Sequence, residues 1–278
     1  MLHESALMSE LLIFLPLLIF LAAVSGFAAG MLGIGGGIIL VPGLYYIFSS
    51  LGYPPDHLMH VAVGTSLAVI VPTGFVSARA HAKKHSVRFD LVKKIGTGIV
   101  LGVGIGTLAA NQISGDALKL FFACALLFLA FFMQLDPDKW QYRGEIPPQP
   151  WPGMVGVVMG TIATLMGIGG ATMNVPYMTL HGVPMRQAIG STAAMGVLVA
   201  VPGALGFLWI GWGEAAVPPF TLGYINLLAS AVLIPFSVIC APFGAHAAHR
   251  VPVKNLRLIF SVFMVCVALH MGYGAIFE

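Results

Sequence analysis

Charged side chains are scarce in this chain, and their scarcity defines its class. Asp, Glu, Lys and Arg make up 8% of the 278 residues, whereas soluble domains carry about 25%. Hydrophobic residues make up 58%, and the mean hydropathy is +0.94. A soluble protein of this length needs far more polar surface. The composition therefore excludes a soluble enzyme, a disordered chain and a nucleic-acid-binding protein. It indicates an all-α membrane protein that crosses the bilayer several times.

Cysteine is also rare, and no acidic residue lies in the middle of an apolar run. Cys124, Cys240 and Cys266 have the spacing of neither a disulfide framework nor a metal site, and we interpret them as core residues. Embedded carboxylates mark cation sites and proton relays. Their absence disfavours a cation pump and favours an anion or a neutral solute as the transported species.

The histidines and hydroxyls do not form a recognisable catalytic or metal-binding pattern. His81 and His85, and likewise His246 and His249, have helical spacing but lie in basic interfacial stretches without a third ligand. The sequence also shows no paired embedded carboxylates and no facing Ser/His pair. We therefore expect no enzyme activity, no metal and no cofactor.

The first apolar run, residues 11–24, has the length of a signal-peptide core. It is preceded by Glu4 and Glu10 without any Lys or Arg, which is the opposite of a signal-peptide start. We interpret it as the first membrane segment of the mature protein.

Two halves of the chain repeat the same motifs in the same order. GIGGGIILVP at 33–42 matches GIGGATMNVP at 167–176, and AVGTS at 62–66 matches AIGST at 188–192. LKLFF at 118–122 matches LRLIF at 256–260. The sequence thus predicts a first transmembrane repeat at 11–135, a polar cytoplasmic linker at 136–150 and a second repeat at 151–277, together one transport domain.

Each half contains five apolar segments. They lie near 11–31, 35–51, 60–82, 90–113 and 117–135, and near 151–166, 170–181, 187–212, 222–248 and 256–277. A full span needs about 20 residues, so 35–51 and 170–181 are too short or too interrupted to be ordinary spans. Because five is an odd number, the second half is expected to cross the membrane upside down relative to the first.

The basic residues support this inverted repeat, since cytoplasmic loops are enriched in Lys and Arg. With the turn after the third segment in the cytoplasm, only Lys119 falls outside and both termini lie outside. The basic residues then inside are Arg79, Lys83, Lys84, Arg88, Lys93, Lys94, Lys139, Arg143, Arg186, Arg250, Lys254 and Arg257. This bias suits a multi-pass protein of a bacterial inner membrane. Arg79, one turn deeper than Lys83, either steers anions at the inner mouth or snorkels to the interface.

The glycine-rich turns are the candidate binding elements. Inverted repeats with interrupted helices are typical of secondary transporters, whose sites lie where the breaks meet. Each turn precedes a short helix, and a helix N-terminus favours an anion. The alternative is that the glycines serve only close helix packing. The backbone positions expected to bind are Gly35, Gly36, Gly37, Gly169, Gly170 and Ala171.

Polar side chains near these turns complete the predicted site. Thr65 and Ser66 in the first half correspond to Ser191 and Thr192 in the second, and their hydroxyls can contact an oxyanion. The alternative is that each hydroxyl bonds to a carbonyl of its own helix. Asn174 has Leu40 at the equivalent position and would make the site asymmetric.

These paired motifs, together with Phe89-Asp90 and Ile225-Asn226 at the start of each fourth segment, resemble the TauE/SafE family over residues 20 to 275. The resemblance implies export of a small sulfur oxyanion or organosulfonate. Its polar motif positions carry over to the glycines and hydroxyls just named. Two departures are Ala171 in place of a third glycine and Asn226 in place of the acid of Asp90.

The sequence therefore predicts a secondary transporter that exports sulfite or an organosulfonate by alternating access. A passive anion channel and a permease for uptake of thiosulfate or another small anion remain open as alternatives. The partners we expect are the anion and the lipid bilayer, with a homodimer left open.

Overall fold

The computed structural model describes residues 2–32, 36–134, 146–247 and 253–277. Two short strands, β1 (Thr221–Leu222) and β2 (Ile225–Asn226), form an antiparallel hairpin, and a short 3₁₀ helix covers Pro55–His57. The α-helices are α1 (Leu2–Leu32), α2 (Gly37–Ser50), α3 (Leu58–Lys83), α4 (Phe89–Ala110), α5 (Gly115–Gln134), α6 (Trp151–Leu165), α7 (Ala171–Leu180), α8 (Met185–Ile210), α9 (Leu227–Ala247) and α10 (Val253–Phe277).

Each of the ten expected segments coincides with one helix, and two of them begin elsewhere than predicted. The first helix starts at Leu2 rather than near residue 11. The segment expected from residue 222 opens as the β1–β2 hairpin, and its helix starts at Leu227. The cause is Asn226, whose Oδ1 accepts a hydrogen bond of 2.8 Å from the N–H of Ala229 and so caps the helix.

Within the described ranges, seven helices are long and apolar enough to cross a membrane, and α2 and α6 are shorter apolar helices. The outer surface is apolar, and the buried core is mostly apolar but also contains hydroxyl side chains. Phe131 is 69% exposed and Leu101 66%, whereas Ser66 and Thr192 are fully buried. This distribution suits a lipid solvent, and it confirms the prediction of an all-α polytopic membrane protein.

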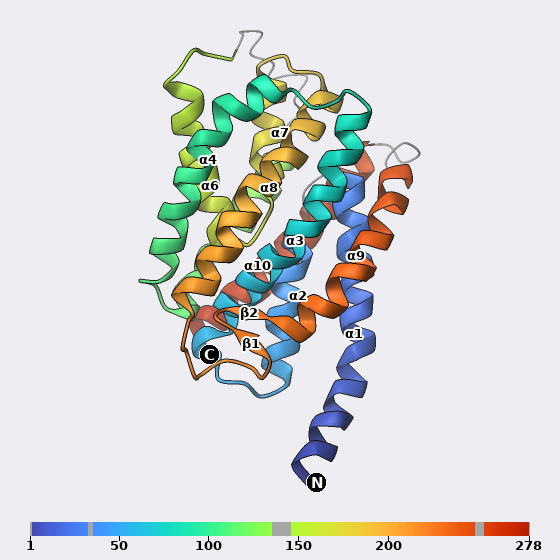
Figure 1. Cartoon of the computed structure of the whole chain (residues 1–278), viewed down its shortest axis with the longest axis vertical. Helices are drawn as coiled ribbons and strands as arrows, with labels where there is room; N and C mark the ends of the chain where they lie inside the picture. The colour runs from blue at the N-terminus through green and yellow to red at the C-terminus, as the bar shows by residue number, and fades with distance from the viewer. Residues whose placement is uncertain (1, 33–35, 135–145, 248–252, 278) are drawn as a thin grey trace.

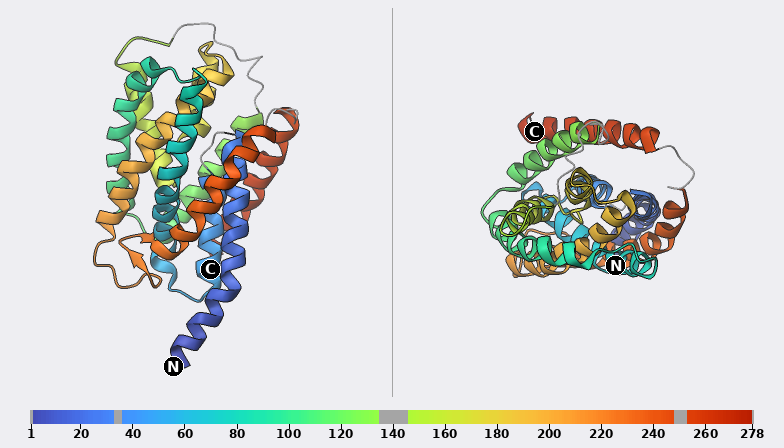
Figure 2. Two further views of the ribbon diagram at one scale, coloured as in Figure 1. Left: turned by 45° about the vertical axis from the view of Figure 1, so that its right-hand side comes forward. Right: turned by 90° about the horizontal axis from the view of Figure 1, so that it is seen from above.

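The helices pack in pairs that join the two halves of the chain. The first helix of each half packs on the fourth helix of the other half: α1 lies on α9, and α6 lies on α4 (Figure 1). Between these pairs α3 packs on α8. Seen from above, α5 and α10 lie side by side along one edge (Figure 2).

Glycines let the backbones of the crossed pairs approach closely. A Cβ on Gly102 of α4 would lie 2.1 Å from Val157 O of α6, and one on Gly160 would lie 2.4 Å from Ile99 O. In the other pair, a Cβ on Gly26 of α1 would lie 2.4 Å from Ser237 O. Small residues are the usual means of close helix packing in membranes. The packing alternative thus accounts for these glycines.

Both chain ends lie in the lower half of the view in Figure 1, together with the hairpin. The turn between α3 and α4, which holds Lys84 and Arg88, lies at the opposite end. One end of the bundle therefore carries this basic turn and the other carries the hairpin.

Candidate substrate cavity

The two glycine-rich breaks meet inside the helix bundle. Gly36 caps α2 and Gly170 caps α7, each with a φ of 71° that favours glycine over any residue with a Cβ. A Cβ on Gly37 would lie only 2.3 Å from Gly167 O, so the start of α2 touches the turn before α7. The repeated motifs, far apart in sequence, are neighbours in space.

The start of α2 directs backbone donors toward this junction. The N–H groups of Ile39 and Leu40 both donate to Gly36 O at 3.0 Å, and the N–H groups before them precede the first helical bonds. At α7, the N–H of Asn174 donates to Gly170 O at 3.3 Å. Helix starts of this kind carry a partial positive charge.

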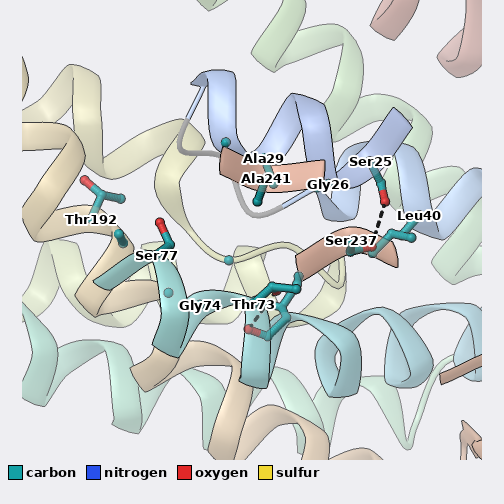
Figure 3. A pocket seen from close by; sticks show the side chains of 16 residues that line it. Ser25, Gly26, Ala29, Leu40, Thr73, Gly74, Ser77, Thr192, Ser237 and Ala241 are labelled. Atoms are coloured by element: carbon teal, nitrogen blue, oxygen red, sulfur yellow. Dashed lines mark hydrogen bonds between the residues drawn. The ribbon is translucent and has the colours of Figure 1, made fainter. Parts of the chain in front are cut away.

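A cavity of about 40 Å³ lies at the junction, large enough to hold water (Figure 3). Its lining side chains are small or hydroxylic, with two larger apolar residues. The lining residues are Ser25, Gly26, Ala29, Gly30, Gly36, Leu40, Ile70, Thr73, Gly74, Ser77, Gly169, Thr192, Ala193, Gly196, Ser237 and Ala241. The lining thus combines both breaks with α1, α3, α8 and α9, and it contains no charged residue.

At one end of the cavity in Figure 3, two serines face each other across α1 and α9. Ser25 and Ser237 each donate to Ala22 O at 3.1 Å, and their hydroxyl oxygens lie 3.4 Å apart. Both hydroxyls therefore lie within hydrogen-bond distance of one backbone carbonyl and of each other.

At the other end, Ser77 and Thr192 lie on α3 and α8 (Figure 3). Thr192 donates to Ala188 O at 2.5 Å and Thr73 to Val69 O at 2.9 Å, both within their own helices. Within the described ranges, the hydroxyl of Ser77 makes no hydrogen bond to protein. Ser77 is thus the hydroxyl in the lining that is free to donate to a ligand.

Three of the predicted binding residues line this cavity: Gly36, Gly169 and Thr192. Gly37 and Gly170 lie in the breaks but not in the lining, and Ala171 is the first residue of α7. Gly35 lies outside the described residues.

The other predicted hydroxyls are buried and hold the breaks and the helix starts in place. Ser66 donates to Gly167 O at 2.8 Å. Thr65 accepts a hydrogen bond of 2.9 Å from the N–H of Asn226, at the start of α9. Ser191 accepts one of 2.8 Å from the N–H of Arg88, at the start of α4.

Asn174 is fully buried one turn into α7. Its Nδ2 donates to Gly170 O at 2.8 Å, while its Oδ1 has no hydrogen-bond partner in the described part of the chain. The side chain thus closes the glycine turn and leaves a buried acceptor beside the break.

Sequence reasoning missed Ser25, Thr73, Ser77 and Ser237. These residues lie outside the repeated motifs, and none has a hydroxyl at the equivalent position of the other half. They reach the cavity because α1 packs on α9 and α3 packs on α8. A scan for hydroxyls facing glycine-rich helix surfaces would have marked Ser25, which is next to Gly26.

The cysteine prediction was wrong for two of the three residues. Cys124 and Cys266 are exposed on the outer surface, and Cys240 is half-buried. An apolar run does not reveal which side of a helix faces lipid. No group of three metal-ligating side chains occurs among the described residues. His249 lies outside them.

A hydroxyl-containing cavity between crossed helices, under an apolar outer surface, is typical of an α-helical membrane transporter rather than of an enzyme. The chain belongs to the sulfite exporter TauE/SafE family, whose model matches residues 18–271.

Its relatives carry names of the same kind. A probable membrane transporter protein of Haemophilus influenzae is 34% identical over 258 residues, covering 93% of this chain and 98% of the relative. One of Methanocaldococcus jannaschii is 27% identical, covering 94% and 97%. YunE of Bacillus subtilis, also named a probable membrane transporter protein, is 24% identical and covers 94% and 98%. No solved structure matches this chain.

Proposed function

We propose that this transporter exports a small sulfur-containing anion, of the sulfite or organosulfonate class, by alternating access. The observation that carries the proposal is the cavity where the two glycine-rich breaks meet, lined by five hydroxyls and no charged side chain. An oxyanion accepts hydrogen bonds from hydroxyls and from helix starts. No carboxylate, the side chain that marks many cation sites within membranes, lines this cavity.

In this proposal Gly36, Gly169, Ser77 and Thr192 contact the anion directly. Ser77 already has a free donor, and Thr192 exchanges its bond to Ala188 O for a charge-assisted one, which is about twice as strong as a neutral bond. The remaining predicted residues act behind them by holding the breaks in position. These are Gly37, Thr65, Ser66, Gly170, Ala171, Asn174 and Ser191.

The proposed alternation uses two inverted repeats. Two equivalent anchors support this arrangement, because Thr65 binds the N–H of Asn226 and Ser191 binds the N–H of Arg88. The packing of α1 on α9 and of α6 on α4 supports it as well, because in both pairs the first helix of one half contacts the fourth helix of the other. In this proposal Arg88, rather than Asp90, is the counterpart of Asn226.

We further propose that the end carrying the turn between α3 and α4 faces the cytoplasm of a bacterial inner membrane, with both termini outside. The enrichment of Lys and Arg at this end supports the orientation. A membrane potential that is negative inside then drives an anion outward, so export is electrically downhill.

The experiment is thermal stabilisation of the purified protein by sulfite, sulfate, thiosulfate, taurine, sulfoacetate, acetate and phosphate. A ligand at 100 times its Kd adds about 2.7 kcal/mol to the free energy of unfolding. We expect a selective shift with a sulfur anion, and we expect Ser77→Ala combined with Thr192→Val to weaken binding at least about tenfold.

Ser50→Ala is the matched control. Ser50 also bonds to a carbonyl of its own helix, Tyr46 O, but it ends α2 about 20 Å from Gly36. A double variant that binds the anion normally would contradict the proposed site. In vesicles, saturable counterflow would distinguish a carrier from a passive channel.

A further inference from the structure

A second hollow lies on the outer surface of the bundle, at the end carrying the basic turn. It is an open groove of about 410 Å³ formed by the end of α3, the following turn, the start of α4 and Ala194 of α8. Three of its apolar side chains are exposed: Phe75 by 55%, Val76 by 46% and Phe89 by 60%. The charged residue in its lining is Arg79.

The groove lies at the depth where a bilayer changes from hydrocarbon to headgroups. From Leu58 to Arg79, a rise of 1.5 Å per residue adds up to about 31 Å, and the hydrocarbon core is about 30 Å thick. Phe75 and Val76 lie about one turn deeper. A cation at headgroup level above an exposed aromatic wall matches an amphiphile with an anionic head and an apolar chain.

Arg79 is exposed, and no acidic side chain lies within 4.0 Å of it in the described ranges. Arg88 provides the contrast, because it forms a two-point ion pair with Asp90 at 2.9 and 2.6 Å. Residues 75–94 hold six basic residues and this single acid. The planar donor array of a free arginine suits a phosphate group.

The groove and the substrate cavity use different sides of the same helix. Gly74 and Ser77 of α3 line the cavity, whereas Val76 and Arg79 line the groove. Val76 is two residues from Gly74, and Arg79 is two residues from Ser77, which in each case is about 200° around a helix. A ligand in the groove would therefore lie behind the cavity wall rather than inside the cavity.

We propose that this groove binds one anionic phospholipid, with its phosphate on Arg79 and an acyl chain along Phe75, Val76 and Phe89. A free inorganic anion would use Arg79 but would gain nothing from the apolar wall. A zwitterionic lipid would gain less from the excess of positive charge. The cationic Arg79 and the apolar wall together therefore favour an anionic phospholipid over the other two ligands.

The test uses the full chain in detergent, with dioleoyl phosphatidylglycerol and dioleoyl phosphatidylcholine as probes and native mass spectrometry to count retained lipid. We expect preferential retention of phosphatidylglycerol and at least a tenfold weaker affinity in Arg79→Gln. The matched control is Arg186→Gln, which removes an exposed arginine from the start of α8, outside the groove. It should bind as the unchanged protein does.

A second pair of variants tests the acyl-chain wall with Arg79 intact. Ala194→Phe or Ala82→Phe fills the groove and should abolish the preference for phosphatidylglycerol. Equal retention of both lipids, or unchanged affinity in Arg79→Gln, would overturn the proposal. So would competition by glycerol phosphate at the same concentration as the lipid, because that would show a site for free anions. The Arg79→Gln comparison decides the question even if neither Phe variant folds.

Discussion

The hydroxyl of Ser66 in α3 donates a hydrogen bond of 2.8 Å to the carbonyl oxygen of Gly167, in the turn that precedes α7. Both residues are buried. This contact connects the hydroxyl motif of the first half directly to the glycine motif of the second half. It holds open a turn in which Gly167 adopts a φ of 63°.

Ser66→Ala should lower stability even without substrate. The substitution leaves Gly167 O unpaired in a buried position, which costs about 1–3 kcal/mol in the free energy of unfolding. Thermal unfolding without ligand should show the loss, and Ser50→Ala should not. A Ser66→Ala protein with unchanged stability but weaker anion binding would assign Ser66 to the substrate instead.

Gly37→Ala should prevent the two breaks from meeting. The new Cβ would lie 2.3 Å from Gly167 O and 2.9 Å from Ile168 Cα, and backbone atoms cannot move aside as a side chain can. We expect a cost of about 3 kcal/mol or more and loss of anion binding.

Gly104→Ala is the control for Gly37→Ala, because a Cβ there has no atom within 4 Å. Alanine is favoured over glycine within a helix, so this variant should keep its stability or gain up to about 1 kcal/mol. Equal behaviour of the two variants in thermal unfolding would show that the break contact is unimportant.

Thr65→Val and Ser191→Ala should have similar effects, because each removes the acceptor for a backbone N–H of the other half. The N–H of Asn226 or of Arg88 would lose its partner, at a cost of about 1–3 kcal/mol. Equilibrium unfolding in mixed micelles measures both costs. A large effect in one variant and none in the other would argue against equivalent anchors.

Stability should fall at alkaline pH through Tyr224. Burial, and then the negative charge of Glu214, raise the pKa of this phenol above its ordinary value. A raised pKa in the folded state contributes stability that is present below the unfolded-state value of about 10 and is lost as pH rises through the folded value.

Unfolding temperatures between pH 8 and pH 11 test this alkaline loss. The unchanged protein should lose stability more steeply above pH 10 than Tyr224→Phe, which has no group to ionise. Glu214→Gln should make the loss smaller, because it removes the second cause of the raised pKa and so brings the folded-state pKa closer to the unfolded value. Identical curves for Tyr224→Phe and the unchanged protein would contradict this assignment.

The helices were predictable because hydropathy alone reports them. Apolar runs bounded by charged or glycine-rich stretches located all ten, including the short helices α2 and α7. The β1–β2 hairpin was not predicted, because Leu222 and Ile225 were read as part of the apolar segment that continues into α9. Its turn is held by Asn226, whose Nδ2 donates to Pro219 O at 2.9 Å and to Thr221 Oγ1 at 3.0 Å.

The lining of the cavity was predictable only where the sequence repeats. Gly36, Gly169 and Thr192 belong to duplicated motifs, whereas Ser25 and Ser237 meet only because α1 crosses α9. Motif repetition also did not reveal what each hydroxyl does, since Ser66 and Thr192 occupy equivalent positions and donate to different carbonyls. Such partners depend on tertiary packing, which local sequence does not encode.

The exchange of helices between the halves has a consequence for synthesis in the cell. When α1 enters the membrane, its partner α9, which begins at Leu227, has not yet been translated, and α4 must likewise wait for α6. The glycine-rich faces of α1 and α4 therefore lack their packing partners until α9 and α6 have been synthesised. Neither half should be a self-sufficient folding unit, yet the two produced as separate polypeptides should still find each other and assemble.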